Sequence, residues 1–510
     1  MDEKLLAACR AAFESTGPAL TLGAPISGKE CAPEPLVRVP LAMMNRHGLI
    51  AGATGTGKTK TLQLLAEQLS AAGVPVFLAD MKGDLSGLGA SGEANDKVAQ
   101  RAKETGWKWT PSPFPVEFLS LAATRGAQLR ATVSSFGPLL LSKVLDLNDT
   151  QAGVLALVFK YCDDRALELL DFGDLRAVLE HLTGAGAADL KGYGGISKTT
   201  VGVLQRKMVE LEQQGALAFF GEPEFDLHDM MQVERDGRGL VSILELQDTQ
   251  DKPALFSTFM MWMLARLYNE LPEVGDVDKP KLVFFFDEAH LLFNGASKAF
   301  LEQVEQVVRL IRSKGVGVFF VTQTPKDVPA DVLAQLGHRV QHALRAFTPN
   351  DQKALSATAK TFPRSDFYDL EETLTTLGIG EAMVTVLSPK GVPSQPFATR
   401  MIPPESRMGP LSDAELQQRL ASSAQVKKYR DTIDRESAEE KLEAGEAGDA
   451  EAGAAAPARG GRPEPSTLEK VLRSPVARSV ATTLTRSLEK DLKRGLMWVL
   501  DKGLTKMGGR

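Results

Sequence analysis

One short segment constrains the fold of this chain more than any other: the stretch IAGATGTGKTKT at residues 50–61. In it, Gly52 is followed by four residues and then by Gly57, Lys58 and Thr59, which is the spacing of a phosphate-binding loop. Glycines let backbone N–H groups surround a phosphate, the lysine reaches the β and γ oxygens of a nucleoside triphosphate, and the threonine hydroxyl suits a bridging Mg²⁺ ion. The residues predicted to contact the nucleotide are Gly52, Ala53, Thr54, Gly55, Thr56, Gly57, Lys58, Thr59 and Lys60.

The flanks of this segment supply the strand and the helix that such a loop requires. The apolar run RHGLIAG precedes it, and KTKTLQLLAEQLSAAG follows with apolar residues at helical spacing before Gly73. The N-terminus of that helix favours anions, which supports a phosphate site. The alternative is a glycine-rich turn that matches by chance, and the strand and helix argue against it.

A second strand is expected to end in two carboxylates. In KLVFFFDEAHLLF the apolar run 282–286 is typical of a central parallel strand, and Asp287 and Glu288 follow at its carboxyl end, where sites in such sheets lie. Asp287 is predicted to hold Mg²⁺ through water, and Glu288 to act as the general base that polarises the attacking water. Taken alone, the same pair could equally be a helix cap.

Further strands complete the predicted sheet. GVGVFFVTQTP contains an apolar run at 316–321 that is followed by Gln323, an amide placed to sense a γ-phosphate or, alternatively, only to satisfy loop backbone. VPVFLAD, ending at Asp80, and GLVSILELQD, ending near Leu246, are two more strands. The alternation of strands with helices predicts an α/β fold with a mostly parallel, doubly wound sheet.

The two catalytic strands are far apart in the sequence, since Lys58 and Asp287 are separated by 229 positions. A minimal βαβ repeat uses far fewer residues, so a folded insertion is expected. Between about residues 125 and 235, apolar residues recur three or four positions apart, which predicts a helical insertion. This insertion either packs against the sheet, which we favour, or grips a substrate.

Composition excludes several classes of protein. The chain has 510 residues, 43% of them hydrophobic, and no apolar run of 18 residues, so neither a transmembrane segment nor a signal peptide is expected and a cytoplasmic location is favoured. Three scattered cysteines fit neither a disulfide framework nor a metal site. The net charge of −6 argues against a globally basic DNA-binding surface but leaves room for a local basic channel.

Four segments together carry a resemblance to a known family: NRHGLIAGATGTGKTKTLQ, FLADMKGDLSGL, FFFDEAHLLF and GVGVFFVTQTP. Over roughly residues 15–410 the chain closely resembles the HerA-like helicase branch of the HerA/FtsK ATPases, and within it the YjgR-type family. The resemblance implies a RecA-like P-loop core, ATP hydrolysis, ring assembly, often as a hexamer, and translocation on double-stranded DNA. The family's catalytic positions match Lys58, Thr59, Asp287, Glu288 and Gln323.

The chain departs from this family in one respect. HerA proper carries a β-barrel before its motor domain, whereas only about 45 residues precede this loop, too few for that barrel and the first core strand. We therefore expect ATP hydrolysis more firmly than DNA translocation. An ATPase that remodels or secretes proteins is the alternative, and a nucleotide-binding regulator is a weaker one, disfavoured by Glu288.

The resemblance also suggests a role for Arg312. The helix KAFLEQVEQVVRLIRSKG places an apolar stripe on one face, with Arg312 at its border and Arg309 further toward solvent. In the resembling family an arginine just before the strand of the polar sensor acts across the subunit interface. Arg312 is therefore a candidate to stabilise the γ-phosphate of a neighbouring subunit, or else an ordinary cation at a helix end.

The C-terminal part changes in composition. We expect the ATPase domain to span residues 1–420, a disordered Ala/Gly/Glu-rich linker to span 421–465, and a basic amphipathic helix to span 466–510. The last segment holds ten Lys or Arg against four Asp or Glu, with leucines every fourth position from Leu484 to Leu500. It is expected to bind a protein partner or a neighbouring subunit, with an anionic membrane surface or DNA as alternatives.

Overall fold

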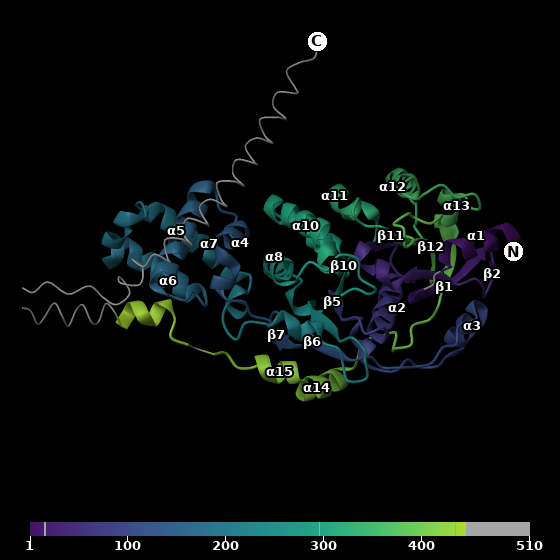
Figure 1. The fold of residues 1–510 in the computed structure, drawn as a ribbon, viewed down its shortest axis with the longest axis horizontal. Helices are drawn as coiled ribbons and strands as arrows, with labels where there is room; N and C mark the ends of the chain where they lie inside the picture. Colours follow the sequence, from purple (N-terminus) through teal and green to yellow (C-terminus); the bar gives the residue numbers. More distant parts are fainter. Residues whose placement is uncertain (15–16, 295, 434, 445–510) are drawn as a thin grey trace, which may run out of the picture. The chain divides into compact units, whose positions relative to one another are not determined.

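The computed structural model describes residues 1–14, 17–294, 296–433 and 435–444 and has the predicted α/β architecture (Figure 1). The strands that run parallel to one another are β4 (Gly48–Ala51), β5 (Val76–Asp80), β6 (Val116–Ser120), β7 (Ala127–Gln128), β8 (Val241–Glu245), β9 (Leu282–Phe286), β10 (Val316–Thr322) and β11 (His338–His342). Their order in space is β11-β4-β10-β9-β5-β8-β6-β7. The strands predicted from apolar runs are therefore present and lie side by side.

An antiparallel extension continues the sheet beyond β11. Its strands are β12 (Glu381–Thr385), β13 (Phe397–Met401), β1 (Ala19–Ser27), β2 (Glu30–Cys31) and β3 (Val37–Pro40). Here β1 pairs with β13, so Gly23 lies opposite Met401, far away in the sequence. Strands β1, β2 and β3 are thus part of the same sheet as the C-terminal strands, and helix α1 (Glu3–Phe13) belongs to the same core.

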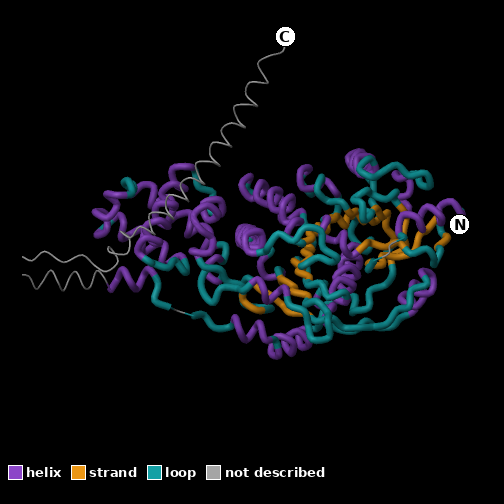
Figure 2. The backbone as a smooth tube through the Cα atoms, in the orientation of Figure 1, coloured by secondary structure: helices purple, strands orange, loops and turns teal. Residues whose placement is uncertain are grey.

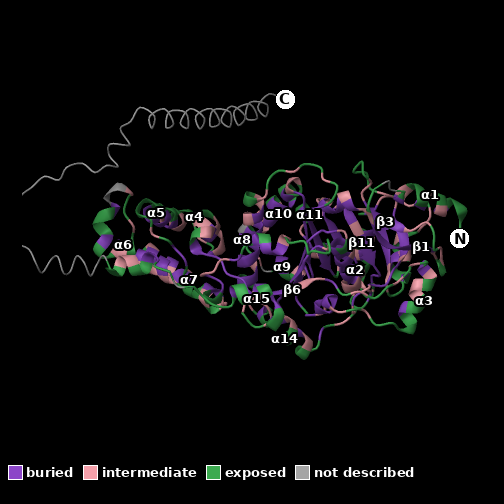
Figure 3. Cartoon of the chain, turned by 60° about the horizontal axis from the view of Figure 1, so that its bottom comes forward, coloured by how far each residue is buried: buried purple, intermediate pink, exposed green. Residues whose placement is uncertain are grey.

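Helices cover both faces of the sheet. On β9, Val283 and Phe285 belong to the core on the face that carries helix α2 (Lys58–Ala71), whereas Phe284 and Phe286 belong to the core on the opposite face, with helices α8 (Pro253–Glu270) and α10 (Lys298–Leu310). This alternation follows from the period of two in a strand, and burial on both faces explains why the central strands are continuous apolar runs. Figure 3 shows these strands buried and the outer helix faces exposed.

The helical insertion lies between β7 and β8 in the sequence. It consists of α4 (Val133–Val144), α5 (Asp149–Arg165), α6 (Phe172–Thr183) and α7 (Lys198–Gln213), with short 3₁₀ turns. Figure 2 shows this region as helices and loops beside the strands. Helix α4 bends at Gly137, which has φ 67°, before Pro138, as expected where a proline interrupts helical hydrogen bonding.

The remaining helices are short. They are α3 (Asp96–Thr105), α9 (His290–Phe293), α11 (Ala330–Leu333), α12 (Pro349–Ala359), α13 (Leu370–Thr376), α14 (Asp413–Ser422) and α15 (Ala424–Tyr429). Within the described residues, no helix combines the length and apolar character needed to span a membrane.

Packed structure continues past residue 420, so the predicted boundary between domain and linker is placed too early. Tyr429 at the end of α15 is fully buried; its hydroxyl donates to Asp229 at 2.6 Å, and its carbonyl accepts from Arg130 at 2.9 Å. Ala438 is also buried, and its N–H bonds to the Glu168 carbonyl at 3.0 Å. The compact unit includes the described residues up to 444. The rest of the predicted linker, and the predicted basic helix at 466–510, lie outside the described residues.

Candidate functional site

The predicted catalytic segments meet at one edge of the sheet. The strands β4, β10, β9 and β5 are consecutive neighbours and parallel, so their carboxyl ends lie together. The phosphate-binding loop follows β4, Gln323 follows β10, Asp287 and Glu288 follow β9, and β5 ends in Asp80. Side chains separated by more than 200 positions in the sequence therefore line one edge.

The loop after β4 has the backbone that its glycines predict. Gly52, Gly55 and Gly57 have φ angles of 153°, 78° and 116°, a region that glycine tolerates and other residues rarely adopt. A side chain on Gly52 would come within 2.5 Å of His342 Cβ, whereas a side chain on Gly55 would meet nothing within 4 Å. Gly52 therefore allows close packing beneath the loop, and Gly55 borders open space.

Lys58 begins helix α2 and is buried. Its ammonium donates to the carbonyls of Gly52 at 2.7 Å and Ala53 at 3.2 Å. Burial lowers the pKa of Lys58, while Glu288 and Asp287 act in the opposite direction. Thr59 and Lys60 follow in the first helical turn, both half-buried. Among the described residues this ammonium bonds only to the loop's own carbonyls, so it can transfer to phosphate oxygens that enter the loop.

Asp287 is buried and electrostatically strained. Burial, then Glu288, then Asp80 raise its pKa to about 7, although one carboxylate oxygen accepts the Glu288 N–H at 2.9 Å. A divalent cation would relieve this repulsion, and carboxylate and hydroxyl oxygens are ligands that Mg²⁺ prefers. Asp287 and Thr59 therefore suit the Mg²⁺ that accompanies a nucleotide.

Glu288 occupies an unusual conformation. It is buried, and its φ of 47° lies in the left-handed region that disfavours non-glycine residues. Its Oε1 contacts the ammonium of Lys82, and its Oε2 lies 3.3 Å from His290 Nδ1 without a hydrogen-bond partner in the described part of the chain. One carboxylate oxygen thus forms an ion pair with a lysine, and the other lacks a hydrogen-bond partner within the described residues.

Lys82 was not predicted as a site residue. It belongs to a turn that Asp80 organises: the Asp80 carboxylate accepts the N–H groups of Lys82 at 3.0 Å, Gly83 at 2.7 Å and Leu85 at 2.8 Å. This turn presents Lys82 to Glu288 on the neighbouring strand. The signal in the sequence is the charged run directly after a predicted strand, in FLADMKGDL.

His342 is a second residue that the sequence did not indicate. It ends β11, is buried, and bonds through Nε2 to the Thr61 hydroxyl at 2.9 Å and through Nδ1 to the Glu381 carbonyl at 2.9 Å. Because a carbonyl can only accept, Nδ1 carries the proton and Nε2 accepts from Thr61. Burial lowers the pKa of His342 to about 4, so the ring is neutral and ties helix α2 to the sheet.

The remaining two predicted residues lie at opposite ends of β10. Gln323 is exposed at the carboxyl end, beside the phosphate loop. Arg312 is exposed in the 3₁₀ turn η7 (Ile311–Lys314) before the strand. The seven residues of β10 span about 20 Å, so Arg312 cannot reach the phosphate loop of its own chain.

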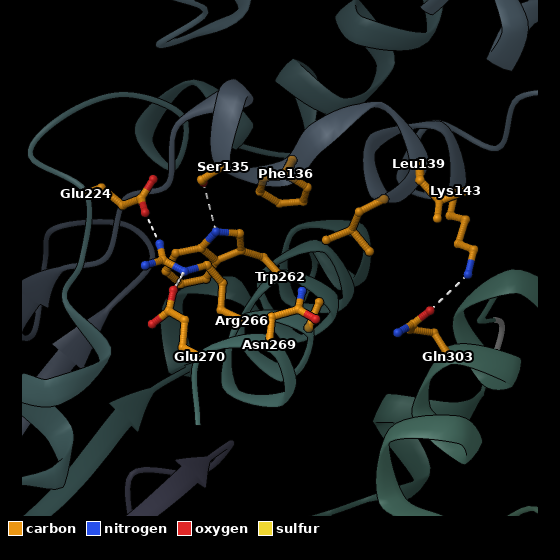
Figure 4. A pocket seen from close by; sticks show the side chains of 12 residues that line it. Ser135, Phe136, Leu139, Lys143, Glu224, Trp262, Arg266, Asn269, Glu270 and Gln303 are labelled. Carbon is orange, nitrogen blue, oxygen red and sulfur yellow. Dashed lines mark hydrogen bonds and ion pairs between the residues drawn. The ribbon is translucent and has the colours of Figure 1, made fainter. Parts of the chain in front are cut away.

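A separate hollow of about 600 Å³ lies where the helical insertion meets α8 and α10 (Figure 4). Several of its polar side chains are already engaged: Trp262 Nε1 donates to Ser135 at 3.0 Å, Arg266 pairs with Glu224 and Glu270, and Lys143 donates to Gln303 at 2.9 Å. None of the predicted site residues lines it. The residues that line this hollow come from the insertion and from the helices that cover the sheet.

Comparison with protein families gives one extensive match. The family described as "Helicase HerA-like C-terminal" matches residues 28–503, most of the chain.

Curated relatives are more distant. A "Probable helicase MJECL08" from Methanocaldococcus jannaschii is 29% identical over 154 residues, covering 28% of this chain and 28% of that protein. A "DNA double-strand break repair helicase HerA" from Sulfurisphaera tokodaii is 24% identical over 366 residues, covering 70% of this chain and 66% of the relative. The chain thus spans about a quarter of the first relative and just under two thirds of the second.

Two solved structures resemble the chain as well. The bacterial conjugative coupling protein TrwBdeltaN70 has a TM-score of 0.48 and 16% identity, covering 78% of this chain and 98% of its own. VirB4 of Thermoanaerobacter pseudethanolicus has a TM-score of 0.47 and 14% identity, covering 76% of this chain and 98% of its own.

Proposed function

Because the chain belongs to the HerA-like helicase C-terminal family, we propose that it is an ATP-hydrolysing motor that acts on double-stranded DNA. The observation that carries the ATPase part is the meeting of Lys58, Asp287 and Glu288 at the carboxyl edge of adjacent parallel strands. A glycine-rich loop that leads into a helix N-terminus, a buried lysine and two buried carboxylates are the set that phosphoryl transfer to water requires.

We assign the residues the following roles. Lys58 moves from the loop carbonyls to the β and γ phosphate oxygens, and Thr59 and Asp287 hold Mg²⁺, which neutralises phosphate charge when it is bound. Glu288 orients the attacking water and accepts its proton. Since Lys82 contacts Glu288 Oε1, this ion pair must loosen before that oxygen can accept a proton. Gln323 contacts the γ-phosphate from the end of β10.

We further propose that the motor works as a homo-oligomer in the cytoplasm, a hexameric ring being the form that the resemblance implies. The position of Arg312 supports assembly, because the residue lies at the edge of the sheet opposite its own phosphate loop. An arginine supplied by a neighbouring subunit would complete each site. Hydrolysis then depends on assembly.

DNA as the substrate rests on the relatives, which are named as helicases. They do not favour the alternative of a motor that moves or remodels proteins. The two functions differ in a measurable way, because binding to the DNA backbone releases counterions and weakens steeply as salt increases.

The test is the rate of ATP hydrolysis with and without duplex DNA, at low and at physiological salt. We expect duplex DNA to stimulate hydrolysis, and the stimulation to fall as salt rises. The Glu288→Gln variant is the control for contaminating ATPases. Hydrolysis that is indifferent to DNA at every salt concentration would rule out the DNA motor and leave the ATPase.

A further inference from the structure

A second cavity, of about 230 Å³, adjoins the phosphate loop. Gly57, Lys60 and Thr61 form one of its walls. The opposite wall comes from the turn before β12, the segment after β13, and helix α3. Its residues there are Lys97, Val98, Arg101, Ile379, Gly380, Met401, Ile402, Pro403, Pro404 and Met408. We call this cavity the β12 slot.

The position of the slot relative to the catalytic carboxylates fixes which end of a nucleotide can reach it. Asp287 and Glu288 follow β9, which lies on the β10 side of the loop strand β4. The slot is built from segments next to β12 and β13, on the other side of β4. A triphosphate with its γ-phosphate near Glu288 therefore directs its α-phosphate, and the base beyond it, toward the slot.

The slot has an exposed apolar rim. Ile379 is 72% exposed and Met408 is 40% exposed, whereas Met401 and Ile402 are buried and form the floor. Exposed large apolar side chains around a cavity are typical of a binding site. The volume is below the roughly 300–1,000 Å³ of a pocket for a whole drug-sized ligand, and suits one flat, apolar part of a larger ligand.

The slot is joined rigidly to the phosphate loop. The N–H of Gly380 donates to the Thr56 carbonyl at 2.9 Å, and a side chain on Gly57 would come within 3.2 Å of Gly380 Cα. Arg101 clamps the same turn by donating to the carbonyls of Ile379 at 2.9 Å and Gly380 at 3.0 Å. A ligand held by the loop thus meets a wall that is already in place.

The polar groups on the walls are largely used within the protein. Besides Gly380, the N–H of Met401 donates to the Gly380 carbonyl at 2.9 Å, and that of Ile402 donates to the Leu22 carbonyl at 3.0 Å. Pro403 and Pro404 have no N–H. The Thr61 hydroxyl is bonded to His342, and the Arg101 guanidinium to the two carbonyls above.

From these observations we propose that the β12 slot binds the purine base of the nucleotide through apolar contact and does not discriminate adenine from guanine. This rests on the proposed function, because the loop must first hold the triphosphate. Strong discrimination requires placed hydrogen-bonding groups that are left unpaired by the wrong ligand, and apolar contact alone gives little.

The test is calorimetric titration of the full-length protein with ATP, GTP and inorganic triphosphate, each with Mg²⁺. We expect ATP and GTP to bind with dissociation constants within about threefold of each other, and inorganic triphosphate to bind at least about tenfold more weakly. The double variant Ile379→Ser/Met408→Ser should lose about tenfold in affinity for both purine nucleotides and keep its affinity for inorganic triphosphate. The matched control is Val392→Ser, an exposed apolar residue that does not line the slot.

The possible outcomes distinguish a failure of the slot proposal from a failure of the proposed function on which it rests. Unchanged nucleotide affinity in the double variant, with triphosphate still binding, would overturn the slot and leave the phosphate site intact. A preference for ATP over GTP greater than about thirtyfold would overturn the lack of base discrimination. If none of the three ligands bound the wild-type protein, the phosphate site itself would be wrong.

Discussion

At the scale of single residues, the site combines groups that are each unfavourable for folding. Asp287 is a buried carboxylate beside two others, Glu288 has a positive φ, and Lys58 is an ammonium buried within a loop of its own carbonyls. Such groups cost stability and are retained where ligand binding or catalysis needs them. Three predictions test their roles and their cost.

Lys58 and Glu288 should give different defects. Lys58→Ala removes the cation that holds the phosphates and should weaken ATP binding. Glu288→Gln keeps the size of the side chain but cannot accept a proton, so ATP binding should persist while turnover falls by about 10²–10⁴-fold. Binding is measured by titration and turnover by phosphate release. Normal turnover in Glu288→Gln would show that this carboxylate is not the base.

The raised pKa of Asp287 predicts how stability depends on pH. An unfolded aspartate ionises near pH 4, but folded Asp287 ionises only near pH 7, so between these values the folded state holds the extra proton. The contribution of Asp287 to the stability of the nucleotide-free, metal-free protein is therefore most favourable at the acid end of this window, falls as pH rises through it, and then levels off.

The variant Asp287→Asn removes the free-energy cost of ionising this buried carboxyl group, and it keeps the oxygen that accepts the Glu288 N–H. At pH 8 in the presence of a chelator it should be more stable than wild type by about 1–3 kcal/mol, and at pH 5 the difference should shrink. Urea unfolding at both pH values measures this. Equal stability of the two proteins at pH 8 would mean that Asp287 is not electrostatically strained.

At the scale of elements, helix α15 shows that a short polar segment can belong to the core. Tyr429 is its only buried aromatic side chain. Its ring packs on Phe225 with centroids 5.1 Å apart, and its hydroxyl accepts the Asp226 N–H at 3.0 Å as well as donating to Asp229. One aromatic residue thus connects the C-terminal segment to the chain that leads into β8.

We expect Tyr429→Ala to destabilise the protein by about 3–5 kcal/mol, as for other large aromatic residues removed from a core. Tyr429→Phe retains the ring and should lose less, about 1–3 kcal/mol, because the Asp226 N–H loses its acceptor and Asp229 loses one of its donors. A chain ending at residue 444 should unfold as cooperatively as the full-length protein, whereas one ending at residue 421 should not. Equal stability of the two truncated chains would show that α15 contributes nothing.

At the scale of the whole molecule, we propose that Arg312 completes the site of a neighbouring subunit. The site of a single chain then has no such arginine of its own. Arg312 makes no ion pair with any described residue. Burial and Arg46 lower its pKa, and Asp276 acts in the opposite direction. In contrast, Arg309 is paired with Glu305 at 2.5 Å on the exposed face of α10. The two arginines are close in sequence and differ in environment, which makes Arg309 a suitable control.

Arg312→Ala should bind ATP normally and assemble, yet lose about 10³-fold or more in turnover, because the arginine acts only on the charge of the transition state. Arg309→Ala should be nearly normal. Mixing Arg312→Ala with Lys58→Ala protein should restore part of the activity, at interfaces that pair an intact loop with an intact arginine. Full activity of Arg312→Ala, or undiminished turnover by a demonstrated monomer, would exclude a role across the interface.

Local chemistry made much of the site readable in the sequence. The loop spacing at 52–59 and the apolar runs before Asp287 and Gln323 predicted the strands and the residues at their ends, because strand burial and loop geometry depend on near neighbours. The boundary at residue 420 was placed too early because the composition around α15 is polar, and the contacts that hold this helix in place are with residues about 200 or more positions away in the sequence.

Only the tertiary structure decided which strands are neighbours, and with them the contacts of the site. Lys82 meets Glu288, and Thr61 meets His342, because β5 lies beside β9 and β11 beside β4. The β12 slot likewise exists only because the segments around residues 380 and 402 return to the phosphate loop. Pairing between strands so distant in sequence is set by the packing of the whole sheet, which the periodicity of any one segment does not encode.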